Sequence, residues 1–314
     1  MPNDDNSLRI GISECLLGAD VRYDGGNKRN SFVLGLLGQA FSFVPVCPEV
    51  ESGMGVPRES VRLKAAEGET AMVGNESQTD YTEGMKKFTV RRIEDLAGSN
   101  LMGFILKSGS PSCGLQVPVE GSEEQEPGLF ARALTEAFPA LPCIEETDLE
   151  DAAARQNFAE RVFAYSRQRR FFGGERSVGQ LVMSHGQAKL QLDAHDPDQH
   201  QAIGELFKQA GDLSYQELGA RYLTRFMEAL KVPATPSSHF GVLKTVFDGI
   251  RKDVEPAVQK ELARALQEYR QGSVPLSVPL TLLRHHVRVL EHPRFHQQTY
   301  LEPEPKELLL RIQV

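Results

Sequence analysis

Short apolar runs alternate with helix-like segments through the first half of the chain. The runs have the length of strands and lie at Leu8–Ser13, Phe41–Val46, Leu101–Lys107 and Ala140–Glu145. The segments between them have helical character and lie at Ser31–Gln39, Thr79–Leu96 and Gly128–Phe138. Alternating strands and helices indicate βαβ units, so we expect a mainly parallel sheet with right-handed crossovers.

The pattern changes after residue 150. A helix is predicted over Leu149–Phe172, which carries the chain out of the sheet, and from about Gly173 the apolar spacing is helical throughout. We therefore predict an α/β N-terminal domain with a mainly parallel sheet, residues 1–168, followed by an all-α C-terminal domain, residues 169–314. The stretch Glu51–Asn75, rich in glycine and charge, is expected to form an excursion near the functional site.

Composition supports two domains, because 314 residues exceed the usual size of a single core. Residues 1–150 hold 13 Lys and Arg against 24 Asp and Glu, a net charge of −11. The total of −8 therefore leaves +3 for residues 151–314, where all eight histidines lie. An acidic half joined to a basic half is compatible with a polyanion that one domain holds and presents to the other.

We expect no secretory or membrane-spanning segment in the chain. It opens with Met1-Pro2-Asn3-Asp4-Asp5 rather than with a basic and apolar leader, and no apolar stretch approaches about 18 residues. We therefore expect a cytoplasmic protein whose thiols stay reduced.

Three cysteines each follow a predicted strand and enter a turn rich in Gly, Pro or Ser. They are Cys15, Cys47 and Cys113. In an open α/β sheet, loops that leave the carboxyl ends of the strands converge on one crevice, so three thiolates can meet there. Three such ligands can hold three corners of an iron–sulfur cube. The alternative for each cysteine is packing as a small buried hydrophobe, which we assign to Cys143 in its proline-flanked apolar stretch.

Spacing argues against other uses of the cysteines. Structural zinc sites usually take their ligands in close pairs, and ferredoxins concentrate theirs in one run. Neither pattern occurs in this chain.

Polar residues beside the cysteines are candidates for chemistry. Glu49 stands two residues after Cys47, across a stiffening proline, and suits a general acid or base. The turn that ends in Cys113 offers hydroxyls and backbone N–H groups that can bind an anion or a cluster sulfide. Its candidate residues are Lys107, Ser108, Ser110 and Ser112. Arg22 and Lys28, in a Gly-Gly loop after Cys15, suit a phosphate or ribose contact; a solvated loop is the alternative for them.

Two basic segments of the second half are candidates for nucleic-acid binding. Arg169 and Arg170 lie beside two phenylalanines, and Arg284 and Arg288 flank two histidines. Basic residues interleaved with aromatic ones are typical of phosphate contacts in RNA binding, although charged helix faces are commonly just solvated.

The cysteine loops together resemble the thiouracil desulfidase family over residues 7–165. The motifs that carry the resemblance are Ser13-Glu14-Cys15-Leu16-Leu17-Gly18, Arg22-Tyr23-Asp24-Gly25, Pro45-Val46-Cys47-Pro48-Glu49 and Lys107-Ser108-Gly109-Ser110-Pro111-Ser112-Cys113-Gly114. Residues 175–303 resemble an uncharacterised helical family that is often fused to the first, with Met183-Ser184-His185 among the matching stretches.

The resemblance implies a 4Fe–4S cluster ligated by Cys15, Cys47 and Cys113. It also implies removal of sulfur from a thiolated uracil without net redox change, and the fused arrangement resembles desulfidases that act on 4-thiouridine in tRNA. On that basis Glu49 activates water, Ser110 orients the ring or assists proton transfer, and the helical domain binds RNA. Two alternatives are a desulfidase of free thiouracil or 4-thio-UMP, and a non-catalytic iron–sulfur sensor. The oligomeric state stays open.

Overall fold

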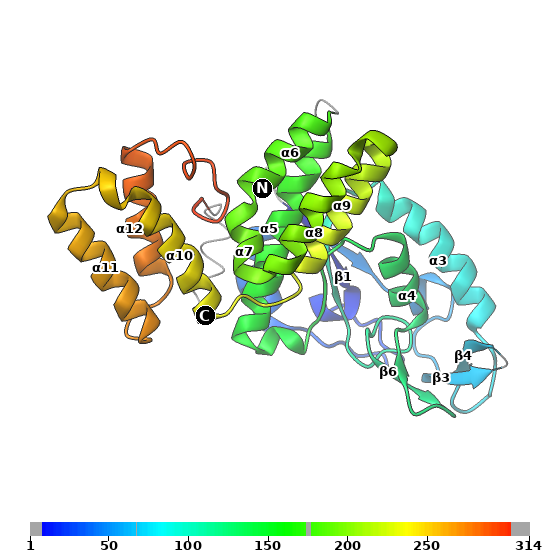
Figure 1. The fold of residues 1–314 in the computed structure, drawn as a ribbon. Coiled ribbons are helices and arrows are strands. Elements are labelled where there is room, and N and C mark those ends of the chain that lie inside the picture. Colours follow the sequence, from blue (N-terminus) through cyan, green and yellow to red (C-terminus); the bar gives the residue numbers. More distant parts are fainter. Residues whose placement is uncertain (1–7, 67, 174–176, 303–314) are drawn as a thin grey trace, which may run out of the picture. The chain divides into compact units, whose positions relative to one another are not determined.

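The computed structural model describes residues 8–66, 68–173 and 177–302. The chain divides into two compact units, with the boundary between Ser166 and Arg167 (Figure 1). The first unit is α/β and the second is helical, as the sequence predicts.

A parallel sheet forms the centre of the first unit. Its strands are β1 (Leu8–Ser13), β2 (Phe41–Val46), β5 (Leu101–Leu106) and β8 (Cys143–Glu145), in the order β2-β1-β5-β8. All three strand pairs are parallel, which confirms the expected sheet. Strand β8 begins at Cys143 rather than Ala140, because Leu141 is held in a turn by the hydrogen bond from its N–H to the carbonyl of Phe138.

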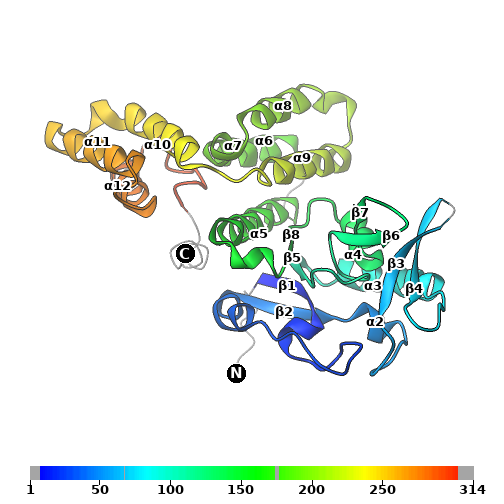
Figure 2. The same ribbon diagram turned by 90° about the horizontal axis from the view of Figure 1, so that it is seen from below.

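Helices cover both faces of this sheet. Val162 of α5 (Ala152–Gly173) packs against the sheet at Gly103. The ring of the neighbouring Phe104 lies 5.8 Å from the ring of Phe130 in α4 (Leu129–Ala137). Because adjacent residues of a strand face opposite sides, α5 and α4 cover opposite faces (Figure 2). The remaining helical segments of the first unit are η1 (Glu14–Leu17), the π-helical turn η2 (Val33–Leu37), α1 (Gly38–Ala40), α2 (Pro48–Glu51), α3 (Thr82–Ala97) and η3 (Asp148–Glu150).

A second, smaller sheet is a feature that the sequence does not predict. It has the order β4-β3-β6-β7, with strands β3 (Val61–Ala66), β4 (Glu69–Gly74), β6 (Val117–Glu120) and β7 (Gln125–Glu126). Half of it comes from the stretch predicted as an excursion. These strands escape a search for apolar runs because they include exposed charged side chains, such as Lys64 and Glu120.

The second unit is a set of helices around an apolar core. Leu243, Val246, Ile250 and Leu283 are fully buried in this core. The helices are α6 (Val178–Gln187), α7 (Lys189–His195), α8 (Pro197–Lys208), η4 (Ala210–Asp212), α9 (Tyr215–Ala229), α10 (Pro236–Ile250), η5 (Arg251–Asp253), α11 (Pro256–Arg270) and α12 (Ser277–Val289). Across the part of the chain that the structure describes, no helix is long and apolar enough to cross a membrane.

The N-terminal end of α4 holds the loop that contains Cys113. The N–H groups of Leu129 and Phe130 donate to the carbonyls of Pro111 and Ser112, at 3.1 and 3.0 Å. Gly128 permits this approach, because a Cβ atom there would lie 2.6 Å from the carbonyl carbon of Ser112.

We expect Gly128→Ala to destabilise the protein by about 1–3 kcal/mol, since the loop must move away from the helix. Gly84→Ala is the control: it lies in α3 with open space around the position, and we expect it to be neutral or stabilising by about 0.5–1 kcal/mol. Urea denaturation measures both free energies of unfolding. Equal stabilities of wild type and Gly128→Ala would contradict the close packing.

Candidate functional site

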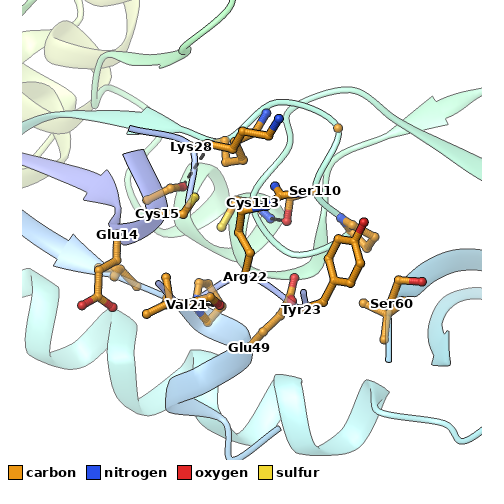
Figure 3. Close-up of a pocket in the computed structure, with 18 of the residues that line it drawn as sticks. Glu14, Cys15, Val21, Arg22, Tyr23, Lys28, Glu49, Ser60, Ser110 and Cys113 are labelled. Carbon is orange, nitrogen blue, oxygen red and sulfur yellow. Dashed lines mark hydrogen bonds between the residues drawn. The ribbon is translucent and has the colours of Figure 1, made fainter. Parts of the chain in front are cut away.

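A cavity of about 380 Å³ opens at the carboxyl edge of the parallel sheet. Cys15 lies in η1 directly after β1, Cys47 caps α2 directly after β2, and Cys113 lies in the loop that leaves β5. All three line the cavity, and their exposed fractions are 9, 9 and 5%. Figure 3 shows Cys15 and Cys113 at the cavity. The parallel sheet thus brings together three thiols that are 98 residues apart from first to last.

The thiols of the cavity are reduced and strongly desolvated. None of the four cysteines is in a disulfide. Burial raises the pKa of Cys15 to about 11, and the neighbouring Cys47 adds to the rise. Burial likewise raises the pKa of Cys47 and, still more, that of Cys113. Three such thiols share one pocket, where metal ions would take the place of their protons.

The donor set of three thiols suits an iron–sulfur cluster, whose iron atoms bind Cys thiolates. Among the described residues, no group of three His, Cys, Asp or Glu side chains is placed to hold one metal ion. A cluster needs no such point, because it distributes its thiolate ligands over separate iron atoms. Cys143 starts β8 and does not line the cavity, so three protein thiols are present there.

Glu49 lies at the cavity wall with both carboxylate oxygens hydrogen-bonded. Its Oε1 accepts a hydrogen bond of 2.9 Å from the hydroxyl of Ser112. Its Oε2 accepts two from the guanidinium of Arg58, at 2.9 Å from Nε and 2.5 Å from Nη2. No local signal in the sequence points to Arg58, because it stands in the irregular stretch before β3 and reaches Glu49 only through the tertiary fold.

The two serines of the Cys113 loop have different surroundings. Ser110 lines the cavity, and its Oγ accepts a hydrogen bond of 3.2 Å from the N–H of Cys113. Ser112, predicted from the sequence to bind substrate, is fully buried and does not line the cavity. Its hydroxyl instead donates a hydrogen bond to Glu49, because the loop orients the Ser112 side chain toward Met72 of the second sheet.

Lys107 and Ser108 also line the cavity, and a carboxylate that the sequence does not reveal fixes both of them. Glu146 pairs with the ammonium of Lys107 and accepts hydrogen bonds of 2.6 and 2.9 Å from the N–H and hydroxyl of Ser108. Glu146 is 8% exposed and lies just after β8 at the same edge as the cysteines. Its position directly after a predicted strand is the signal by which the sequence could have identified Glu146.

Arg22 and Lys28 line the cavity on the loop that leaves η1. The N–H of Lys28 donates to the carbonyl of Cys15 at 3.0 Å, which keeps this loop beside the cysteine. Arg22 lies 3.5 Å from Asp24 and stacks over Tyr23 at 5.3 Å from the ring centroid. This loop therefore brings two cationic side chains to the cavity.

The predicted RNA-binding residues occupy two helices of the chain. Arg169 and Arg170 are exposed near the end of α5. Arg284 and Arg288 lie on α12, which packs against α10 and α11. Arg288 is 60% exposed and forms an ion pair with Glu302. The structure does not gather these four arginines on one helix.

Comparison with known proteins assigns both parts of the chain to family models. Residues 10–146 match the model described as 2-thiouracil desulfurase, and residues 189–305 match a family described as a protein of unknown function, DUF1722. The uncharacterized protein YbgA of Escherichia coli (strain K12) is 27% identical over 154 residues, which are 48% of this chain and 90% of YbgA. The uncharacterized protein YbbK of Bacillus subtilis (strain 168) is 31% identical over 108 residues, or 33% of this chain and 71% of YbbK. A solved structure of the 4Fe-4S-dependent thiouracil desulfidase TudS is 26% identical, with a TM-score of 0.39, over 46% of this chain and 94% of that one.

In the metal-free protein we expect Cys15 to be alkylated by iodoacetamide with a rate that keeps rising toward pH 11. A raised pKa leaves less thiolate at neutral pH than in an ordinary cysteine, whose pKa is about 8.5. The measurement is the pH profile of Cys15 labelling, followed by peptide mass spectrometry, with N-acetylcysteine as reference. A midpoint near that of the reference would show that burial does not govern this thiol.

Proposed function

The chain belongs to the 2-thiouracil desulfurase family through residues 10–146, and from this premise we propose that it removes the sulfur of a thiolated uracil with a 4Fe–4S cluster held by Cys15, Cys47 and Cys113. The observation that carries the proposal is the placement of three buried thiols and Glu49 around one cavity. Thiols alone suit a redox sensor as well. An acid–base group fixed beside them favours catalysis.

A 4Fe–4S cluster held by Cys15, Cys47 and Cys113 would supply a Lewis-acidic iron, free of protein thiolate, for a soft thiocarbonyl sulfur. The chain contributes three thiols there and no fourth, since Cys143 lies outside the cavity. Cysteines that form no disulfide are typical of proteins in a reducing compartment, in line with the cytoplasmic location expected from the sequence.

The residues of the cavity perform the proton chemistry of a hydrolysis. Water adds to C4 of the thiouracil while Glu49 accepts one of its protons. Ser110, whose Oγ already accepts the N–H of Cys113, keeps its own proton to donate to the ring or to the leaving sulfur. One C–S bond breaks and one C=O bond forms, so thiouracil and water give uracil, hydrosulfide and a proton. No electrons are gained or lost.

The substrate that we propose is 4-thiouridine in tRNA, with uridine as the product. Arg22 and Lys28 at the cavity wall suit the phosphate of a nucleotide rather than a free base. A base inside a folded RNA must leave its stack to reach a site lined by buried thiols. The basic residues Arg169, Arg170, Arg284 and Arg288 then serve as phosphate contacts. Free 4-thio-UMP or thiouracil is the alternative substrate.

We expect the anaerobically reconstituted protein to convert 4-thiouridine in tRNA to uridine with release of hydrosulfide. Glu49→Gln should keep the cluster and lose about 100-fold or more in kcat, because general base catalysis contributes about 10²–10⁴-fold. Cys15→Ser, Cys47→Ser or Cys113→Ser should lower the iron content, whereas Cys143→Ser is the control that keeps it. Loss of the thiocarbonyl absorbance and an iron assay measure the two effects. A stable cluster without turnover on any thiolated uracil would favour the sensor.

Neutralising Arg284 and Arg288 to Gln should weaken processing of tRNA by about tenfold at physiological salt and leave 4-thio-UMP unaffected. The reason is that each phosphate contact adds to the salt-dependent affinity for RNA. Arg264→Gln is the matched control, an arginine 80% exposed on α11. The measurement is kcat/KM for both substrates at two salt concentrations. Equal losses on both substrates would remove the RNA contact from α12.

A further inference from the structure

We propose that Arg58 is a positioning residue that fixes the orientation of Glu49 and leaves Oε1 as the oxygen that takes the proton. This inference rests on the proposed function, because it concerns the base of that reaction. Arg58 lies in the stretch between α2 and β3, and only 6% of its side chain is exposed.

The guanidinium of Arg58 is bonded to several segments at once. Besides Glu49, it donates to the carbonyl of Val21 at 3.0 Å and to that of Gly55 at 2.8 Å. Its own geometry is therefore set by three separate parts of the first unit. A buried cation held by several hydrogen bonds fixes the orientation of the carboxylate that it pairs with. Only 14% of the Glu49 side chain is exposed.

The two carboxylate oxygens of Glu49 differ in how many further hydrogen bonds each can accept. Each carboxylate oxygen offers about two lone-pair sites. Oε2 accepts both Nε and Nη2 of Arg58, so its sites are filled. Oε1 accepts the hydroxyl of Ser112 and no second hydrogen bond from the described residues, so one site remains for a proton from water.

Arg58 also links this base to the loop that carries Arg22. Its backbone N–H donates to the carbonyl of Tyr23 at 2.9 Å, next to Arg22, while its side chain holds Val21. The loop and the carboxylate therefore depend on one residue for their positions. A shift of Arg58 moves both relative to the reacting carbon.

Lysine cannot replace this arrangement. A lysine ammonium is a point charge on a flexible stem, whereas the planar guanidinium places its donors in a rigid fork. Arg58→Lys keeps the charge near Glu49 and loses the simultaneous bonds to Val21 and Gly55. This single substitution therefore tests the position of the cation separately from its charge.

The first experiment compares Arg58→Ala and Arg58→Lys with Arg62→Ala. Arg62 is a matched control, because it is an arginine four residues away with bonds to Glu120, Asn75 and Gln78, none of which lines the cavity. We expect kcat on 4-thio-UMP to fall about 100-fold in both Arg58 variants, the loss typical of a misplaced group, and KM to change much less than kcat. Millimolar guanidinium should restore part of the kcat of Arg58→Ala. Arg62→Ala should retain wild-type kcat.

The second experiment needs no turnover and no cluster. Glu49 of the metal-free protein is labelled with a carbodiimide and glycine ethyl ester, and the modified peptide is quantified by mass spectrometry. We expect labelling of Glu49 to rise at least about fivefold in both Arg58 variants and to stay unchanged in Arg62→Ala, with circular dichroism confirming that each variant is folded.

The two experiments separate this inference from the proposed function. Inactive wild-type protein would refute the desulfidase, while the labelling of Glu49 would still decide whether Arg58 holds it. Unchanged labelling in the folded Arg58→Lys variant would overturn the positioning role. A kcat of either folded variant within about threefold of wild type would overturn it as well.

Discussion

The parallel hydrogen bonding of β1 with β2 and β5 is the constraint on which the site depends. Neighbouring parallel strands end at one edge of a sheet, so the loops that leave their carboxyl ends lie close together. Cys15, Cys47 and Cys113 lie in the segments that leave these three strands. One antiparallel strand among the three would send its cysteine to the opposite edge, and no adjustment of the loop would recover it.

Two buried ion pairs then set the polarity around the thiols. Arg58 pairs with Glu49 beside Cys47, and Lys107 pairs with Glu146 near Cys15, whose pKa Lys107 lowers against the larger effect of burial. Because Glu49 and Glu146 each have a counter-ion, less uncompensated negative charge remains beside Arg22 and Lys28 in the cavity.

The sequence was enough to predict the strands and the cysteines, because both leave local signals. An apolar run that ends in a turn is visible at Leu8–Ser13 and Phe41–Val46, and the structure has strands with these same bounds. The second sheet could not be predicted in this way, since β3 and β6 carry exposed residues among their buried ones. Arg58 and Glu146 escape prediction for a related reason: their partners lie 9 and 39 residues away and are chosen by the fold.

Ser110 and Ser112 show how far local reasoning extends within a single motif. The sequence predicts substrate binding by Ser112, and the resemblance implies a catalytic role for Ser110. The carbonyls of Pro111 and Ser112 are bound by the first turn of α4, and this docking turns Ser112 inward while Ser110 keeps the cavity side. The buried Ser112 still has a role, because its hydroxyl donates to the Glu49 carboxylate that Arg58 also binds. A motif can thus identify the place of the chemistry, whereas the division of labour among its residues depends on which neighbouring element the loop packs against.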